Sequence, residues 1–233
     1  MITIIAFDLD DTLYDEVDYC KSGFTVVSRF LATQPPAINA ERIFECLWKH
    51  FSAGNRTTTF NAACNELGIT YNTVFIQKLV QLYRHHIPKI ALPDDTRDVL
   101  QQLTGKFALA LLTDGFLPAQ KLKVQALGIE KFFKCIIYTE ELGRACWKPS
   151  TTGFEKMMQQ LNAGPENIAY VADNMEKDFI APNKLGMLTI QLIRPNRLHT
   201  ESSEQPHAAP KHIIQKITDL PPLLEKQQNL PFA

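Results

Sequence analysis

The sequence predicts an α/β fold: a doubly wound parallel (Rossmann-like) sheet with an inserted all-helical cap domain. Three observations predict it. Five short apolar runs, rich in β-branched residues, read as strands buried on both faces, and helical patterns alternate with the later ones. A long helical segment separates the first run from the second. Acidic residues follow several of the runs, at the edge where open α/β sheets bind ligands.

The strands and their connecting helices alternate along the chain, so right-handed crossovers would place the strands in one parallel sheet. The predicted strands are Ile2–Leu9, Ala108–Thr113, Cys135–Tyr138, Ile168–Ala172 and Leu188–Leu192. The predicted helices between them are Asp95–Leu103, Ala119–Leu127, Thr152–Leu161 and Phe179–Lys184. After a polar loop over residues 194–211, we expect an edge strand within His212–Ile217 and a last helix over Pro221–Gln227.

About 98 residues separate the first two strands, whereas a crossover needs only about 10 to 12. Apolar residues in this gap recur at helical spacing, and Pro and Gly clusters divide it into four predicted helices. We therefore predict a catalytic core formed by residues 1–15 and 90–233, with a helical cap over residues 16–89.

Composition restricts the classes of partner. The 233 residues are 45% hydrophobic, enough for a sizeable core, and their net charge of -1 gives no field that would attract nucleic acid or anionic lipid. No signal peptide or membrane-length apolar run is present in the sequence, and the five cysteines form no C-x-x-C pair. No histidine has zinc-ligand spacing from them. We expect a cytoplasmic protein with reduced, mostly buried thiols and with neither a nucleic-acid nor a membrane partner.

Several polar residues would converge on the carboxyl edge of the sheet. Carboxylates gathered there repel one another unless a cation lies between them. Since the ligands offered are oxygens, we expect Mg²⁺, which commonly meets a phosphate group in such sites. The converging residues are Asp8 and Asp10, Thr113 and Asp114, Lys148, and Asp173, Asn174 and Asp178.

Four segments together resemble the motifs of the haloacid dehalogenase superfamily, in its phosphatase branch with a helical cap after the first strand. The segment D-L-D-D-T at 8–12 resembles the first motif and Thr113 the second. Lys148 with Pro149 resembles the third, and V-A-D-N-M-E-K-D at 171–178 the fourth. The resemblance covers the whole predicted core domain.

The resemblance implies a role for each site residue. Asp8 would be the nucleophile that forms an aspartyl-phosphate, and Asp10 would protonate the leaving alcohol and then activate water. Thr113, Asp114 and Lys148 would bind the phosphate. Asp8, the main-chain carbonyl of Asp10 and Asp173 would ligate Mg²⁺, while Asn174 and Asp178 would lie behind these ligands, where Asp178 would orient water or Lys148.

Three positions depart from the family pattern. Ala172 replaces a usual Gly before the metal ligand, and Asp114 replaces a common Asn, which adds a negative charge near the phosphate. Pro182 lies inside the predicted helix after the fourth motif, where we expect a bend or a helix start.

The sequence thus predicts a Mg²⁺-dependent phosphatase that acts on a small phosphorylated metabolite, with the cap excluding water and selecting the leaving group. A sugar phosphate, a nonulosonate phosphate and a nucleoside monophosphate stay open, as does the oligomeric state. A 2-haloacid dehalogenase, a phosphomutase and a non-catalytic regulatory or binding protein are the alternatives. The polar cap residues Lys49, His50 and Arg56 are candidates for substrate contact.

Overall fold

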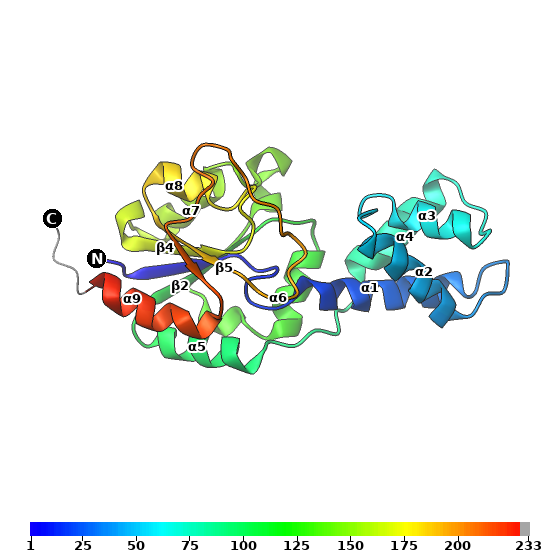
Figure 1. Ribbon diagram of the computed structural model, residues 1–233, viewed down its shortest axis with the longest axis horizontal. Helices are drawn as coiled ribbons and strands as arrows, with labels where there is room; N and C mark the ends of the chain where they lie inside the picture. Colours follow the sequence, from blue (N-terminus) through cyan, green and yellow to red (C-terminus); the bar gives the residue numbers. More distant parts are fainter. Residues whose placement is uncertain (229–233) are drawn as a thin grey trace. The chain divides into compact units, whose positions relative to one another are not determined.

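The computed structural model describes residues 1–228, which contain a six-stranded sheet. All neighbouring strands are parallel, in the order β3-β2-β1-β4-β5-β6 (Figure 1). The strands are β1 (Ile4–Phe7), β2 (Ala108–Thr113), β3 (Cys135–Tyr138), β4 (Ile168–Ala172), β5 (Leu188–Leu192) and β6 (His212–Ile214). The predicted α/β class with a doubly wound parallel sheet is confirmed.

Strand β1 lies in the middle of the sheet, between β2 and β4. Its last residue, Phe7, is opposite Leu111 of β2 and Val171 of β4. From β1 the chain builds β2 and β3 on one side and later β4, β5 and β6 on the other, so the strand order reverses next to β1. The carboxyl ends of strands at such a reversal form the usual ligand-binding crevice of open α/β sheets.

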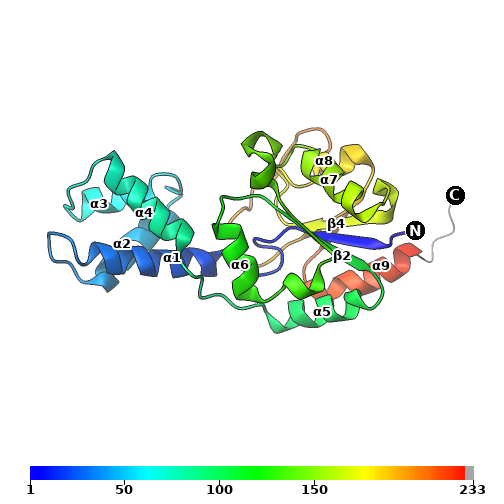
Figure 2. The ribbon, with the colours of Figure 1, turned by 180° about the vertical axis from the view of Figure 1, so that it is seen from behind.

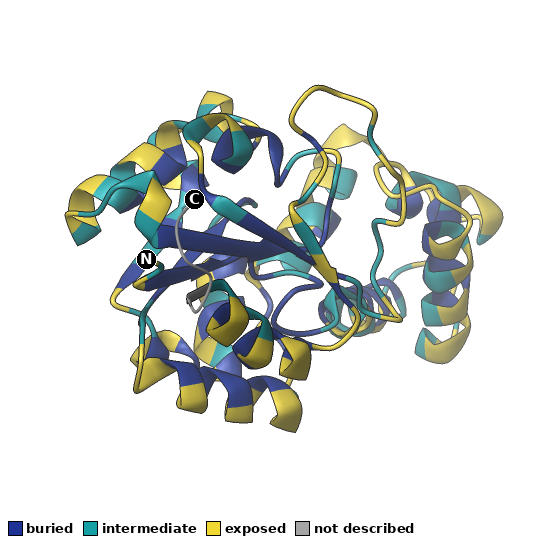
Figure 3. Cartoon of the chain, turned by 60° about the vertical axis from the view of Figure 1, so that its left-hand side comes forward, coloured by how far each residue is buried: buried dark blue, intermediate teal, exposed yellow. Residues whose placement is uncertain are grey.

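Helices cover both faces of this sheet. Helices α7 (Thr152–Leu161) and α8 (Ile180–Leu185) lie on one face, while α5 (Asp94–Thr104) and α9 (Leu220–Gln228) lie on the other (Figures 1 and 2). The strands between them are largely buried, whereas the helices keep an exposed outer side (Figure 3). Burial on both faces explains why the strands are nearly continuous apolar runs rather than alternating ones. Short 3₁₀ turns occupy Glu130–Phe132, Thr139–Leu142, Arg144–Cys146, Pro165–Asn167 and Ile217–Asp219.

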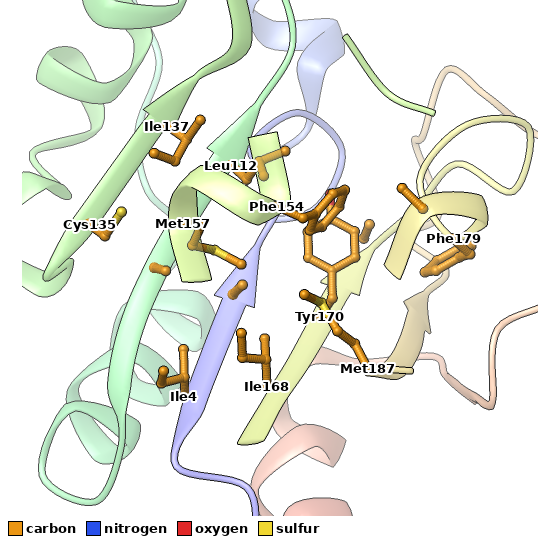
Figure 4. Packing of buried hydrophobic residues seen from close by; sticks show 14 residues of the cluster. Ile4, Leu112, Cys135, Ile137, Phe154, Met157, Ile168, Tyr170, Phe179 and Met187 are labelled. Atoms are coloured by element: carbon orange, nitrogen blue, oxygen red, sulfur yellow. The ribbon is translucent and has the colours of Figure 1, made fainter. Parts of the chain in front are cut away.

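The core on the α7 and α8 side is built from every second residue of the central strands (Figure 4). Ile4, Leu112 and Ile168 are among them, and Phe154 of α7 packs against Tyr170 of β4. Their ring centroids are 4.9 Å apart at an interplanar angle of 83°, the edge-to-face arrangement that aromatic quadrupoles favour. The aromatic pair therefore fixes α7 on the sheet close to the carboxyl end of β4.

Gly153 permits the close approach of α7 to the strands. A Cβ atom at this position would lie 3.1 Å from Thr139 Cγ2 and 3.2 Å from Leu112 Cδ1. These contacts are tighter than ordinary van der Waals distances, so a larger side chain would push the start of α7 away from the sheet. Because Lys148 lies four residues before α7, the glycine helps to hold that lysine in place.

A second compact unit comprises residues 18–90 and 117–126. Its helices are α1 (Glu16–Leu31), α2 (Ala40–Ser52), α3 (Thr59–Glu66), α4 (Thr73–His85) and α6 (Ala119–Leu127). Phe24 of α1 is the centre of its aromatic core, with Phe51, Phe60 and Tyr83 at centroid distances of 5.3, 6.2 and 5.4 Å. The four helices predicted between the first two strands are present as α1 to α4.

Some element boundaries differ from the sequence-based expectation. Strand β1 begins at Ile4 and ends at Phe7, although the N–H of Asp8 still donates to the Val171 carbonyl of β4 at 2.9 Å; the chain turns after that contact. Pro182 is the third residue of α8, in the first turn, where a missing N–H leaves no helical hydrogen bond unmade. The predicted division into residues 1–15 with 90–233 and residues 16–89 stays a prediction, and the compact units place most of α6 with the helical segment.

Within residues 1–228, no helix has both the length and the apolar character that crossing a bilayer requires.

We expect Phe154→Ala to destabilise the sheet-containing unit by about 3–5 kcal/mol, because it leaves a cavity beneath Tyr170. Thermal or denaturant unfolding followed by circular dichroism measures the loss. Ile213→Ala is the matched control: its side chain is 56% exposed on the edge strand β6, and we expect a change of about 0.5 kcal/mol or less. A similar loss of stability in both variants would contradict the packing role assigned to Phe154.

Candidate active site

Three neighbouring strands deliver polar residues to one edge of the sheet. Asp8 follows β1, Thr113 ends β2, and Asp173 follows β4. All three residues are buried, with 4%, 1% and 3% of their surface exposed. Since β1 pairs with both β2 and β4, the sheet itself places these side chains side by side at its carboxyl edge.

Lys148 is the cationic centre of the site. Its Nζ lies 2.7 Å from Asp8 Oδ1, 2.7 Å from Asp178 Oδ1 and 3.1 Å from the Tyr170 hydroxyl. Burial acts to lower its pKa, but the carboxylates of Asp178 and Asp8 outweigh burial and raise the pKa of Lys148 well above its usual value. The lysine is therefore a fixed positive charge in contact with the carboxylate of Asp8.

Asp8, Asp173 and Asp178 form a buried carboxylate cluster. One oxygen from each lies within 4.8 Å of the other two. Burial raises the pKa of Asp8 to about 7, and burial with the charges of Asp178 and Asp8 raises the pKa of Asp173 well above its usual range. Asp173 Oδ2 is buried without a hydrogen-bond partner. Such a group is costly unless a cation or another donor contacts it.

The cluster fits a hard divalent cation. The donors are carboxylate oxygens alone, as Mg²⁺ prefers, and an oxygen of Asp173 remains available for a ligand bond. Asp178 is held in a different way, since its Oδ2 accepts a 3.0 Å hydrogen bond from the backbone N–H of Asn174. Its Oδ1 makes an ion pair with Lys148 Nζ at 2.7 Å. Asp173 and Asp8 are thus the better-placed ligands, with Asp178 behind them.

Asp10 lies outside this three-carboxylate cluster. Its side chain accepts a 2.6 Å hydrogen bond from the Tyr14 hydroxyl, and it is half-buried. The contact fixes the direction of the Asp10 carboxylate on the turn that follows β1. A half-buried carboxylate held in this way can exchange protons with a substrate or water.

Asp114 forms hydrogen bonds with the backbone of the segment that carries Lys148. Its carboxylate accepts hydrogen bonds of 3.2 Å from the backbone N–H of Lys148 and lies 2.7 Å from the Thr139 hydroxyl. Lys177 Nζ lies 3.7 Å from Asp114 Oδ2. The Thr113 hydroxyl lies 3.3 Å from the main-chain carbonyl oxygen of Asp114. The extra negative charge predicted at Asp114 is therefore used to hold the Lys148 backbone.

The turn after the first strand is tied to a distant loop. Asp11, at φ 52°, accepts hydrogen bonds from the backbone N–H groups of Glu16 at 2.8 Å and Leu198 at 2.6 Å. Arg194 donates to the carbonyls of Thr12 at 3.1 Å and Leu13 at 3.3 Å. These contacts fix the turn that carries Asp10.

Arg194 has a further partner, the Thr96 hydroxyl at 2.7 Å, and it forms an ion pair with Asp15 at 3.4 Å. A guanidinium can serve several acceptors at once because its donors lie in a rigid plane. Arg194 thus links α5, the turn after β1 and the loop after β5.

The sequence-based search did not identify four residues of this site: Tyr170, Lys177, Asp11 and Arg194. Tyr170 carries a detectable signal, since it is the only residue with a polar side chain in the apolar run of β4. Lys177 and Asp11 lie inside the motif segments, at positions to which no role was assigned. Arg194 has no local signal, because its partners are distant in sequence.

A family comparison agrees with this geometry. The model of the haloacid dehalogenase-like hydrolases matches residues 5–192, which include the carboxylate cluster and Lys148. Curated relatives extend over most of the chain. A glyceraldehyde 3-phosphate phosphatase of Methanocaldococcus jannaschii is 25% identical over 210 residues, covering 88% of this chain and 90% of the relative. The N-acylneuraminate-9-phosphatase of Mus musculus is 23% identical over 239 residues, covering 96% and 94%.

Solved structures share the fold at lower identity. A 2-haloacid dehalogenase from Pseudomonas syringae pv. Tomato superposes with a TM-score of 0.66 at 22% identity, covering 97% of this chain and 100% of that one. A hydrolase of Bacillus subtilis solved bound to magnesium also has a TM-score of 0.66 at 22% identity, covering 96% and 98%. The family match, the parallel sheet and the four motif segments together establish that this chain belongs to the haloacid dehalogenase-like hydrolases.

Proposed function

We propose that this protein is a Mg²⁺-dependent phosphatase that hydrolyses a small phosphorylated metabolite through an aspartyl-phosphate on Asp8. One observation carries the proposal: the buried oxygens of Asp8, Asp173 and Asp178 lie within 4.8 Å of one another, beside a lysine in contact with Asp8. This arrangement supplies a nucleophile, a cation site and a fixed positive charge at one point. The curated relatives are phosphatases of small phosphorylated compounds, which supports a phosphoric monoester hydrolase.

The reaction has two displacements at phosphorus. In the first, an Asp8 oxygen forms a bond to phosphorus while the bond from phosphorus to the alcohol oxygen breaks, and Asp10 gives its proton to that alcohol. In the second, Asp10 takes a proton from water, whose oxygen attacks phosphorus. The bond between phosphorus and Asp8 then breaks, inorganic phosphate leaves, and the Asp8 carboxylate is restored.

The surrounding residues prepare these steps. Lys148 holds an Asp8 oxygen at 2.7 Å and places positive charge where negative charge accumulates on the phosphoryl group. Thr113, at the end of β2, would donate to a phosphate oxygen, while Asp114 keeps the Lys148 backbone in place. Asp8, Asp173 and the Asp10 carbonyl would hold Mg²⁺, with Asn174 and Asp178 behind them. When bound, Mg²⁺ neutralises the carboxylates and polarises the phosphoryl oxygens.

The proposed substrate class rests on the phosphatase chemistry of the site and on the names of the curated relatives. A triose phosphate or a nonulosonate phosphate is suggested by the names of the relatives, and a nucleoside monophosphate stays an alternative. We assign the choice of leaving group to the helical segment over residues 16–89. We also propose a cytoplasmic location, in keeping with five cysteines that form no C-x-x-C pair.

The alternative functions account for fewer of the residues in this site. Dehalogenation by Asp8 requires neither a cation nor a proton donor for a leaving oxygen. It therefore explains neither Asp173 as a cation ligand nor Asp10 as a proton donor. A phosphomutase shares the same groups and differs in the acceptor of the phosphoryl group. A non-catalytic binding protein on this fold has no use for the Asp8 and Lys148 pair, which is retained here at 2.7 Å.

We expect wild-type protein with Mg²⁺ to release inorganic phosphate in a screen of phosphorylated metabolites. Asp8→Asn removes the nucleophile and should abolish release, and chelation with EDTA should do the same. Asp98→Asn is the control, because it removes an exposed carboxylate on α5 and should leave the activity unchanged. Equal turnover by Asp8→Asn, or full activity in EDTA, would refute the mechanism, and halide release from a 2-haloacid would favour the dehalogenase.

We expect Asp114→Ala to lower kcat by tenfold or more, and Asp114→Asn to stay within tenfold of wild type. The alanine removes the side-chain acceptor of the Lys148 N–H, at a cost of about 1–3 kcal/mol, and leaves the Thr139 hydroxyl only the Thr113 carbonyl at 3.2 Å, whereas asparagine keeps one oxygen. Steady-state kinetics and thermal unfolding measure both variants. If alanine and asparagine have the same effect, the carboxylate does not act through the Lys148 backbone.

We expect Arg194→Lys to reduce kcat/KM by about tenfold and the unfolding temperature by a few degrees, since an ammonium cannot serve the separated acceptors of the guanidinium. Kinetics and thermal unfolding are compared with those of Arg29→Lys, an exposed arginine on α1 that should tolerate the change. Normal kcat/KM in Arg194→Lys would show that the turn after β1 keeps its geometry without this contact.

A further inference from the structure

A second group of metal-ligand side chains lies in the helical unit. Cys46 and His50 are one turn apart on α2, and Glu66 is the last residue of α3. The Cys46 sulfur, a ring nitrogen of His50 and a Glu66 carboxylate oxygen all lie within 4.8 Å of one another. A search for C-x-x-C pairs does not find this group, because its members are spaced by a helical turn and by a helix contact.

Two of the three residues, Cys46 and Glu66, line a cavity at the protein surface. The cavity has a volume of about 250 Å³, and Cys46 and Glu66 are among its lining residues, together with Arg42, Glu45, Lys49 and Leu67. Cys46 is 5% exposed, and the side chains of His50 and Glu66 are 18% and 40% exposed. An ion can therefore reach the group from solvent, while the sulfur lies on the protein side of the site.

The donor set suits Zn²⁺ rather than Mg²⁺. Thiolate, imidazole and carboxylate are the donors that zinc sites use, and three protein ligands leave a fourth position for water. Bonds of about 2.0–2.3 Å in a tetrahedral site separate neighbouring ligand atoms by roughly 3.3–3.8 Å. The group lies close to this geometry, since His50 Nε2 and Glu66 Oε2 are 2.9 Å apart and all three atoms fall within 4.8 Å.

The contacts of the metal-free group do not prevent metal binding. Lys49 Nζ lies 2.9 Å from both Glu66 oxygens, but its side chain is 66% exposed, and exposed ion pairs of this kind contribute little stability. The Cys46 thiol lies 4.0 Å from the Ala63 carbonyl oxygen, the outer limit for a sulfur contact, and it also interacts with the Glu66 carboxylate.

We propose that Cys46, His50 and Glu66 form a Zn²⁺ site that ties α2 to α3. The site is independent of the proposed phosphatase chemistry, because its ligands belong to the helical unit and include a sulfur atom. It explains why a buried cysteine, a histidine and a glutamate meet where a simple ion pair of Lys49 and Glu66 needs neither of the other two. Binding to the folded form alone would stabilise the helical unit.

Co²⁺ titration of the full-length protein, reduced and stripped of metal, tests the proposal in the presence of excess Mg²⁺. We expect one equivalent of Co²⁺ to produce a thiolate-to-metal charge-transfer band, which an oxygen-only site cannot give. Zn²⁺ should displace Co²⁺ and abolish the band, and Zn²⁺ added to the metal-stripped protein should raise the unfolding temperature. Absence of the charge-transfer band in the wild-type protein would overturn the proposal.

Variants identify the ligands. Cys46→Ser should remove the band, and His50→Gln and Glu66→Gln should each weaken Zn²⁺ affinity by more than tenfold. Cys146→Ser, a half-buried cysteine of the sheet-containing unit, should bind as wild type. Glu66 is largely exposed, so Glu66→Gln keeps the test valid if Cys46→Ser does not fold. Retention of the band in folded Cys46→Ser, or unchanged Zn²⁺ affinity in both other variants, would also contradict the proposal.

Discussion

The active site depends on one electrostatic constraint: carboxylates removed from water must be balanced by positive charge. Lys148 balances Asp8 and Asp178 at 2.7 Å, but Asp173 has a buried oxygen with no hydrogen-bond partner. Without a cation the imbalance appears as a raised pKa, to about 7 at Asp8. The proposed divalent ion between Asp8 and Asp173 would remove the same imbalance.

The fold creates this constraint because β1 is the central strand. Its neighbours β2 and β4 end at the same edge, and no other strand of the described sheet has both of these partners. Asp8, which follows β1, therefore lies between Thr113 at the end of β2 and Asp173 after β4. Lys148 comes from the segment before α7, which Gly153 and the contact of Phe154 with Tyr170 hold close to the sheet.

The sequence predicts the parts of the molecule that carry periodic or local signals. Five strands, the helical segment and the joint presence of Asp8, Lys148 and Asp173 are detectable because apolar runs and motif spacing lie within short stretches. The contacts of Arg194 with Thr12 and Leu13 are not predictable, since 182 and 181 residues separate the partners. The cluster of Cys46 and His50 with Glu66 escapes prediction for a related reason: its third member comes from another helix.

The hydrogen bonds of Asp114 show how a departure from a family pattern can be accommodated. A second negative charge beside the phosphate site would oppose an anionic substrate if it faced that substrate. Here the carboxylate faces the backbone N–H of Lys148 and the Thr139 hydroxyl, and Lys177 Nζ lies 3.7 Å away. Hydrogen-bond donors of the protein and a nearby ammonium therefore stabilise the negative charge of Asp114. The same contact fixes the lysine on which the charge balance of Asp8 depends, so the substitution strengthens the positioning of Lys148 and limits the repulsion of phosphate.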